Sequence, residues 1–303
     1  MTLLSFGFNG FEQVRQETNI TRILFTSWET AIVVVNDDEI VVWGYQPDYI
    51  TPLLNNAHLI QSIFGDPNEC MGIITYANTS ITITPSGERH DWTDVQDACW
   101  SQGSIFVLST QGLLYQDQQP VVGLPKVRAI CGSSQHVLCL TDEGIYGIGS
   151  NRFSQLGTEP YQEQQQEPQM IDHFSGIYLD RVSLACGPFH SVVIIDGDVY
   201  TFGLSKDGRL GSGDSDSIVD LAVFLDDQGE SIEVNAVKAV CGSCHTLVLD
   251  DQGRVWSCGS NKYGQLGRSV IEGHDAYFRQ CTSVNQKATD CSAGRWNSFV
   301  LTI

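Results

Sequence analysis

The feature that most constrains the fold of this chain is a short phrase that recurs about every fifty residues. Four copies are clear, at residues 131–140, 186–194, 241–249 and 292–301. Each copy has one anchor residue before a run of apolar positions, and these anchors are His136, His190, His245 and Asn297. Successive anchors lie 54, 55 and 52 residues apart. A fixed period of this length predicts a repeat architecture, in which each repeat is one supersecondary unit that stacks on the next.

A second phrase follows the anchor in three of the copies. It covers residues 145–157, 199–211 and 255–267, and it reads Gly-Ser-Asn or a close variant before a Leu-Gly pair. Turns rich in Asp and Gly separate the two phrases. Short β-branched runs joined by such turns predict β-hairpins, and the first glycine predicts a bend or a close backbone approach. We therefore expect each repeat to be a small antiparallel sheet and a ring of these sheets to form a propeller.

Three more divergent copies precede these, with anchors assigned to Glu29, Cys70 and Gly103. Residues 4–10 match the second half of a repeat, whereas residues 294–301 form a first half with nothing after them. Two half-repeats can combine into one sheet, which joins the ends of a ring and removes exposed sheet edges.

The sequence thus predicts an all-β fold, a seven-bladed β-propeller closed by a blade shared between the N- and C-termini. We expect residues 1–303 to form a single domain, with repeats strongest over 131–303 and most divergent over 45–112. The Gln-rich segment 159–169 is bounded by prolines and predicts a mobile loop between blades. The segment 214–217 lacks the glycine and the glutamate of a calcium loop and predicts a solvated turn.

Charge and hydropathy exclude several classes of function. The net charge is −20 with only 16 Lys and Arg, and no basic cluster is available to neutralise phosphates, so direct binding to nucleic acid is not expected. A basic protein partner would be attracted at long range. No apolar run is long enough to cross a bilayer and no secretory signal is evident, so we expect a cytoplasmic or nuclear protein without a membrane association.

The sequence Cys241-Gly-Ser-Cys244-His245 matches a haem-attachment signature and supplies half of a zinc site. The sister copies argue against both, because Cys241 and His245 recur in copies that lack the second thiol. We therefore expect no cofactor and no metal. The repeated histidines are expected to satisfy local backbone hydrogen bonds, and the ten cysteines to be reduced and mostly buried.

The position directly before each anchor is the best candidate for a binding site, because it varies between copies whereas a core position would be uniformly apolar. The candidate partner-binding residues are Trp28, Glu69, Gln102, Gln135, Phe189, Cys244 and Trp296. Three of them are large aromatics, which are enriched at the energetic centres of protein interfaces. Ring closure would place Trp28 and Trp296 in neighbouring blades.

The doublet of Cys-Gly-x-x-His with Gly-Ser-Asn-x-x-x-Gln-Leu-Gly resembles the regulator of chromosome condensation repeat. The resemblance is strong over 131–303 and weaker over 1–130, and it implies a seven-bladed propeller. Within that family, residues 6–13, 27–31 and 294–299 look most like the small domain-containing member that partners a JmjC-type oxygenase.

These observations favour a non-enzymatic scaffold that acts as a monomeric propeller within a hetero-complex. No nucleophile elbow and no phosphate-binding loop occurs in the sequence. The resemblance implies a JmjC oxygenase complex, or a chromatin- or microtubule-linked role. It also leaves two alternatives: a guanine nucleotide exchange factor for a Ran-like GTPase, and a partner of a small zinc protein in tRNA modification and diphthamide synthesis.

Overall fold

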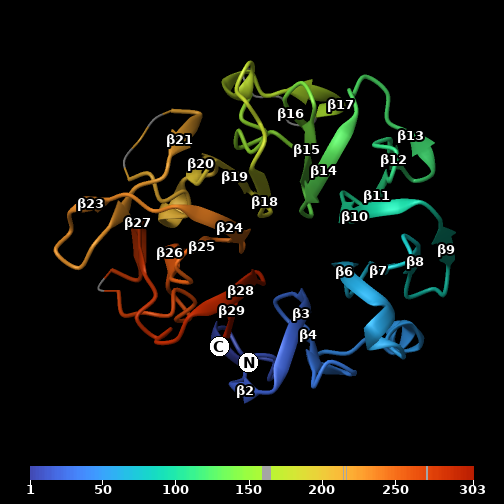
Figure 1. The fold of residues 1–303 in the computed structure, drawn as a ribbon, viewed down its shortest axis with the longest axis horizontal. Helices are drawn as coiled ribbons and strands as arrows, with labels where there is room; N and C mark the ends of the chain where they lie inside the picture. The colour runs from blue at the N-terminus through green and yellow to red at the C-terminus, as the bar shows by residue number, and fades with distance from the viewer. Residues whose placement is uncertain (159–164, 214, 216, 271) are drawn as a thin grey trace.

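Seven sheets stand around one axis like the blades of a propeller in the computed structural model (Figure 1). The structure describes residues 1–158, 165–213, 215, 217–270 and 272–303. Consecutive strands within a blade pair antiparallel, and the chain moves from one blade to the next after each outer strand. The predicted all-β, seven-bladed propeller is confirmed.

The blades are numbered in chain order by the strand that begins each repeat and lies nearest the axis. The blade that contains both chain termini begins with β28 (Ala288–Ala293) and is therefore blade 7. Blades 1 to 3 consist of β3 (Ile20–Thr26), β4 (Thr30–Val35) and β5 (Glu39–Gly44); β6 (Ile60–Asp66), β7 (Cys70–Thr75), β8 (Ser80–Ile83) and β9 (Arg89–Trp92); and β10 (Val95–Ser101), β11 (Ser104–Ser109), β12 (Leu114–Gln116) and β13 (Gln119–Pro120). Blades 4 and 5 consist of β14 (Val127–Gly132), β15 (His136–Thr141), β16 (Ile145–Gly149) and β17 (Gln165–Met170); and β18 (Val182–Cys186), β19 (His190–Ile195), β20 (Asp198–Gly203) and β21 (Val219–Leu221).

Blade 6 is a six-stranded sheet, and its extra strands come from the segment that follows blade 5. It contains β24 (Ala236–Cys241), β25 (His245–Asp250), β26 (Val255–Ser260), β27 (His274–Gln280), β22 (Phe224–Leu225) and β23 (Ser231–Ile232). Blade 1 has three strands, and the short 3-10 helices η1 (Asp48–Leu53) and η2 (Ala57–Leu59) follow it. Two more 3-10 turns are η3 (Asp172–Phe174) and η4 (Lys206–Gly208). No helix in the described part of the chain is long and apolar enough to cross a membrane.

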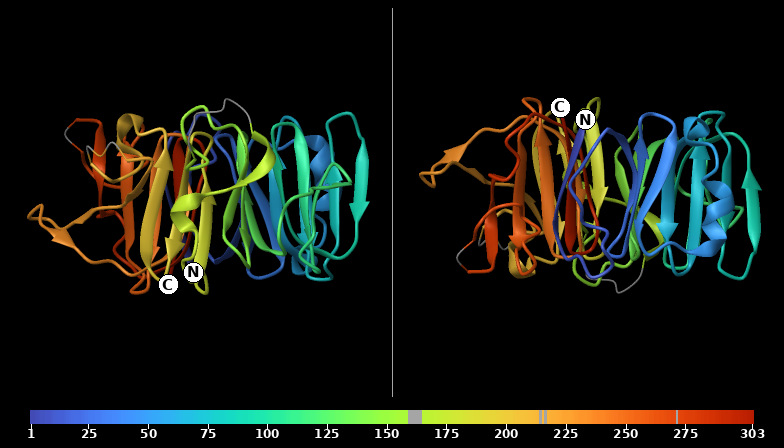
Figure 2. Two further views of the ribbon diagram at one scale, coloured as in Figure 1. Left: turned by 90° about the horizontal axis from the view of Figure 1, so that it is seen from above. Right: turned by 90° about the horizontal axis from the view of Figure 1, so that it is seen from below.

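Blade 7 is assembled from both ends of the chain. It contains β28 (Ala288–Ala293), β29 (Asn297–Thr302), β1 (Thr2–Gly7) and β2 (Glu17–Thr18). β1 pairs antiparallel with β29 from Thr2 opposite Thr302 to Gly7 opposite Asn297. The two termini therefore lie side by side, where the other blades have a hairpin turn (Figure 2). The predicted closure by a shared blade is confirmed.

The Gln-rich segment departs from its prediction. Residues 165–170 are not a loop but β17, the outer strand of blade 4, which pairs with β16 across a register shift. Pro168 is tolerated there because an outer strand needs no donor on its free edge. The rest of the predicted loop, 159–164, and residues 214 and 216 of the predicted solvated turn lie outside the described residues.

The hydrophobic core lies between blades rather than within any one of them. Each second strand β15, β19, β25 and β29 is buried along its whole length, because both faces of the sheet meet a neighbouring blade. Leu138 and Leu140 of blade 4, for example, pack in one cluster with Val193 and Ile195 of blade 5. Six of the ten cysteines are buried and four half-buried, and all ten are free thiols.

The ring has two distinct faces. One, called the loop face, bears the turns that precede each second strand, at 27–29, 67–69, 102–103, 133–135, 187–189, 242–244 and 294–296. It also bears the loops that follow each third strand. The opposite face, called the hairpin face, bears the turns between second and third strands and the two chain termini. All seven candidate binding residues lie on the loop face.

A relay of hydrogen bonds joins blades 4 to 7 near the loop face. His136 Nε2 lies 2.6 Å from Ser191 Oγ of blade 5, His190 Nε2 2.8 Å from Thr246 Oγ1 of blade 6, and His245 Nε2 2.9 Å from Ser298 Oγ of blade 7. Each hydroxyl in turn donates to a backbone carbonyl, and these carbonyls belong to Gln155, Arg209 and Gln265. The prediction of local backbone bonds for the histidines is wrong, because each imidazole reaches across to the next blade.

The relay fixes the state of each histidine. A hydroxyl has one proton, and here it is given to a carbonyl, so the imidazole Nε2–H must be the donor to that hydroxyl. All three rings are fully buried. Burial lowers the pKa of His136 to about 3 and that of His245 to about 4, and it lowers the pKa of His190 well below its usual range. The relay is therefore neutral in the native fold.

The relay makes folding sensitive to mild acid. A histidine whose pKa is depressed in the folded state binds its proton only on unfolding, so its stabilisation is complete above pH 6.5 and is lost as the pH falls from there toward 4. Each such histidine costs about 1.4 kcal/mol at pH 5.5. We expect His190→Gln, whose amide Nε2 can still donate to Thr246, to lose about 1.4 kcal/mol less than the native chain between pH 7.5 and 5.5. Urea unfolding at both pH values measures this, and equal losses would contradict it.

Candidate functional site

The loop face is organised by one glycine position at the end of each third strand. Gly149 and Gly203 have φ values of 110° and 112°, and a Cβ would come within 2.7 Å and 2.6 Å of the carbonyl oxygens of Gln135 and Phe189. The predicted close backbone approach is therefore confirmed, and only glycine satisfies it. The same glycine position in blade 1, Gly44, faces the carbonyl of Glu29.

This contact and the strand bounds correct the alignment of two divergent blades. In blade 1 the residue before the anchor is Glu29, because the Tyr45 N–H donates to its carbonyl as the Ser150 N–H donates to that of Gln135. The anchor of blade 1 is thus Thr30, the first residue of β4, and Trp28 lies two positions before it. In blade 3, β11 begins at Ser104, which makes Gly103 rather than Gln102 the residue before the strand. Cys70 is correctly placed as the first residue of β7.

Four of the seven candidate residues meet in one depression, here called the four-blade hollow. It has a volume of about 480 Å³, and its lining includes Gln135, Phe189, Cys244 and Trp296, one from each of blades 4 to 7. All four are half-buried. The other three lie apart from it: Glu69 and Gln102 are exposed on blades 2 and 3, and Trp28 lies beside blade 7.

An aromatic cluster crosses the seam between blades 7 and 1. Trp296 and Trp28 pack edge to face with ring centroids 5.8 Å apart, so the two tryptophans belong to neighbouring blades as predicted. Phe8 contacts Trp296 at 5.9 Å, and Phe11 contacts Trp28 at 5.1 Å. Tyr263 of blade 6 completes the cluster at 5.3 Å from Phe8. Such pairs add about 1 kcal/mol each beyond area burial.

This seam lacks the histidine relay. Asn297 replaces the histidine, and the residue of blade 1 that would carry the hydroxyl is Ala31. Both amide atoms of Asn297 are buried without a hydrogen-bond partner in the described part of the chain. Here Thr26 Oγ meets Ser292 Oγ at 2.6 Å, and Gln13 Nε2 donates to the Trp28 carbonyl at 2.7 Å. The aromatic cluster and these two contacts hold the closing seam.

Arg209 anchors the floor of the four-blade hollow. It is only 4% exposed, it occupies the position held by Gln13, Gln155 and Gln265 in sister copies, and burial lowers its pKa. Its Nε donates to the Lys206 carbonyl at 2.8 Å, and Nη1 donates to the Ser243 carbonyl of blade 6. Asp207 Oδ2 lies 3.4 Å from its Nη2. All three nitrogens of the guanidinium therefore contact groups of the protein itself, and the bond to Ser243 links blade 5 to blade 6.

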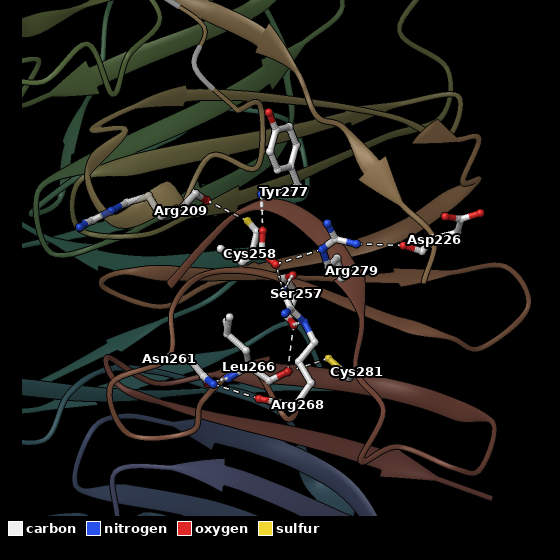
Figure 3. Close-up of polar contacts among 11 residues, drawn as sticks. Arg209, Asp226, Ser257, Cys258, Asn261, Leu266, Arg268, Tyr277, Arg279 and Cys281 are labelled. Carbon is white, nitrogen blue, oxygen red and sulfur yellow. Dashed lines mark hydrogen bonds and ion pairs between the residues drawn. The ribbon is translucent and has the colours of Figure 1, made fainter. Parts of the chain in front are cut away.

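The loop of blade 6 beside the hollow is fixed by an internal network (Figure 3). The Leu266 N–H donates to Asn261 Oδ1 at 2.9 Å, and Asn261 Nδ2 donates to the Arg268 carbonyl at 2.9 Å. The Arg268 guanidinium lies 3.1 Å from Asp275, which Arg279 also contacts at 3.2 Å. These contacts fix the conformation of the loop 261–268, which includes Lys262 and Tyr263.

A second, narrower hollow marks the mouth of the central channel. Its volume is about 270 Å³, and residues from all seven blades line it. Arg295 Nη2 and Asp66 Oδ2 lie 3.7 Å apart at its rim. Nearby, Glu29 is 4% exposed and accepts a hydrogen bond from Asn68 Nδ2 at 2.6 Å, and burial raises its pKa. No group of three or more metal-ligating side chains occurs within the described ranges.

Sequence reasoning missed the cationic and buried polar residues of this face. Lys206, Arg209 and Arg295 line the four-blade hollow, but none of them stands directly before an anchor, which is the position that the sequence singled out. Lys206 was detectable, since it aligns with Arg152 and Lys262 in the sister loops. Cys244 lines the hollow too, but burial raises its pKa, which makes the thiol a weak nucleophile.

Sequence comparison identifies the repeats. A profile of the regulator of chromosome condensation (RCC1) repeat matches residues 142–194, 196–249 and 252–301, just over half of the chain, and a second profile of the same repeat matches 236–265. The zebrafish (Danio rerio) protein RCC2 homolog is 30% identical over 212 residues, which are 63% of this chain and 41% of that protein. The human (Homo sapiens) RCC1 domain-containing protein 1 is 26% identical over 225 residues, which are 61% of this chain and 58% of that protein. The chain thus spans less than two thirds of either relative.

Solved structures agree on the fold. Human WBSCR16 superposes with a TM-score of 0.79 over the whole of both chains at 15% identity. Prp20p from Saccharomyces cerevisiae, whose structure was described with its binding to Gsp1p and histones, gives a TM-score of 0.76 at 13% identity over all of this chain and 92% of that one. At these identities the likeness concerns the propeller alone.

The closing seam should depend on Trp296. We expect Trp296→Ala to lower the free energy of unfolding by about 2 kcal/mol, below the usual cost for a fully buried tryptophan because this one is half-buried. Trp296→Phe should retain most of that stability, since it keeps the edge-to-face contacts. The control is Tyr178→Ala, at a side chain that is 77% exposed, with an expected effect within about 0.5 kcal/mol. Chemical unfolding measures all three, and an equal cost for Trp296→Ala and Tyr178→Ala would refute the role of the cluster.

Proposed function

This chain belongs to the RCC1 repeat family, and we propose that it is a non-enzymatic scaffold whose four-blade hollow holds another protein. The observation that carries the proposal is the convergence of Gln135, Phe189, Cys244 and Trp296. These residues occupy one repeat position yet differ in every blade. A purely structural position in a repeat would keep one residue type. The glycine that contacts the carbonyl of this residue, at the end of each third strand, does so.

The physical character of the hollow suits a protein ligand. Half-exposed aromatic rings are held by neighbours, Phe189 by Phe153 at 5.8 Å and Trp296 by the seam cluster, so little side-chain entropy is lost on binding. Aromatic side chains of this kind are frequent hot spots. Trp28 lies next to Trp296 and extends the same surface toward blade 1. Glu69 and Gln102 would contact only a partner large enough to cover the whole loop face.

The proposed partner is a protein rather than nucleic acid, cofactor or membrane. Residues 6–13, 27–31 and 294–299 resemble the small domain-containing member of the family that partners a JmjC-type oxygenase, so we propose a complex of that kind, and a chromatin- or microtubule-linked assembly is the broader form of the same proposal. The net charge of −20 favours a partner that is basic overall. We expect residues 1–303 to act as one monomeric unit of that complex, in the cytoplasm or the nucleus.

Two other roles remain candidates within the family. The first alternative is exchange activity toward a Ran-like GTPase, which rests on the family resemblance; Prp20p, which is described with binding to Gsp1p, has the same propeller fold. Release of labelled nucleotide from Ran, accelerated by catalytic amounts of this chain, would establish that role. Stoichiometric capture of a small zinc protein would instead support a function in tRNA modification or diphthamide synthesis.

The proposal predicts that filling the hollow abolishes binding. Cys244→Trp places in blade 6 the residue that blade 7 already has at the same position, so the backbone accommodates it. The matched control is Gln252→Trp, at an exposed turn of the same blade on the hairpin face. We expect Cys244→Trp to reduce recovery of the native partner at least tenfold, measured by quantitative affinity capture from the native cell, while Gln252→Trp leaves it unchanged.

Circular dichroism and urea unfolding would first establish that both variants are folded. Recovery of the same partners in the same amounts by the native chain and by Cys244→Trp would refute a docking role for the hollow. Equal losses for both tryptophan variants would refute it as well, because the effect would then not depend on the loop face.

A further inference from the structure

Three consecutive blades present a cation at the same point of the loop face. Arg152, Lys206 and Lys262 each directly follow an Asn or Ser that stands two positions after the glycine near the end of the third strand in blades 4, 5 and 6. All three side chains are exposed. None of them forms an ion pair with any carboxylate in the part of the chain that the structure describes. The three are here called the cationic arc.

The arc is unusual in a chain with so few cations. Only 16 residues are Lys or Arg against 36 Asp and Glu. Most of the cations elsewhere are neutralised by a carboxylate, such as Arg89 by Asp91 at 2.8 Å and Arg181 by Asp196 at 3.0 Å. Among the described residues, three of the six cations that make no ion pair share this one repeat position. The arrangement therefore places exposed positive charge on one side of the loop face of an acidic molecule.

Aromatic rings accompany the arc. The Arg152 guanidinium lies 5.5 Å from the Phe153 ring centroid, and Lys262 Nζ lies 5.4 Å from that of Tyr263. Lys206 lines the four-blade hollow with Phe189 and Trp296. The hollow thus combines an apolar rim with cations at its edge.

The remaining charges of the loop face are of both signs. Arg295 adds a fourth cation, 44% exposed, although Asp66 lies 3.7 Å from it. Asp207 is the acidic residue that lines the hollow, and it is turned toward buried Arg209. Exposed carboxylates lie at Glu272 in the loop of blade 6, at Glu12 in the loop of blade 7, and at Asp48 and Glu69 on blades 1 and 2. The described loops of blades 4–6 present three exposed cations and one exposed carboxylate, Glu272, so an acidic chain would be attracted to them more than to blades 1 and 2.

We propose that the four-blade hollow and the cationic arc bind an acidic, extended segment of the protein partner. One apolar side chain of that segment sits between Phe189 and Trp296, and carboxylates on either side of it pair with Lys206, Lys262 and Arg152. The inference rests on the proposed scaffold function and specifies its ligand. It is compatible with a partner that is basic overall, because the overall charge acts at long range whereas the arc acts on contact.

A fluorescein-labelled twelve-residue peptide of Asp and Glu around one central Phe serves as the probe, with fluorescence anisotropy on the full-length chain as the measurement. We expect binding that weakens with salt, and at least a tenfold loss of affinity for the double variant Lys206→Glu and Lys262→Glu. The control is Lys126→Glu with Lys287→Glu, which changes the same charge at exposed lysines near the hairpin face and should leave binding unchanged. The double variant Lys206→Arg and Lys262→Arg keeps the charge and should bind the peptide as the native chain does.

Equal losses for the two charge-reversal pairs would overturn the proposal, because only the net charge would then matter. So would equal binding of a peptide with Lys in place of Asp and Glu, or of the all-acidic peptide with Gly in place of Phe. Equal competition by a single-stranded oligonucleotide of the same charge would also overturn it, by showing a general polyanion site. If the acidic peptide fails to bind while Cys244→Trp still abolishes capture of the native partner, the scaffold function survives and this inference alone is refuted.

Discussion

The pairing of β1 with β29 is the constraint on which the rest of the structure depends. Six successive residue pairs, from Thr2 opposite Thr302 to Gly7 opposite Asn297, turn two half-sheets into one blade. Without this closure each end of the ring would expose an unpaired strand edge and the apolar face that packs on its neighbour. Closure also brings Trp296 against Trp28 and sets blade 7 beside the hollow, so the candidate binding surface exists only in the closed ring.

The blades are held together by equivalent contacts, and departures from equivalence mark the surface that can recognise a partner. The buried histidine of blades 4 to 6 and the hydroxyl that follows the anchor residue in blades 5 to 7 recur because they form a neutral relay between neighbours. One position earlier, the side chain no longer has to meet the next blade, and it becomes Gln135, Phe189, Cys244 or Trp296. Rigidity is thus supplied by what repeats and specificity by what does not.

Much of this could be predicted from the sequence because the repeat period is a global property of the chain. The number of blades, the shared blade and the glycine at each close approach all follow from spacing and residue type. The alignment of blades 1 and 3 was one residue out, because Glu29 and Gly103 stand where only the hydrogen bonds of the folded strand identify the anchor. The partner of each histidine could not be found, since Ser191 lies 55 residues beyond His136 and becomes a neighbour only in the ring. The Gln-rich strand β17 was missed because its composition is typical of loops, whereas pairing with β16 decides its conformation.

The central claim is that this scaffold recognises its partner through the loop face over blades 4 to 7. Hydrogen–deuterium exchange on the native complex and on the free chain tests this claim most directly. The account predicts slower exchange on binding in the turns 133–135, 187–189, 242–244 and 294–296 and in the loops that carry Lys206 and Lys262, with no change at the hairpin turns 142–144, 196–197 and 251–254. Protection confined to the hairpin turns, with the loop face unchanged, would contradict it.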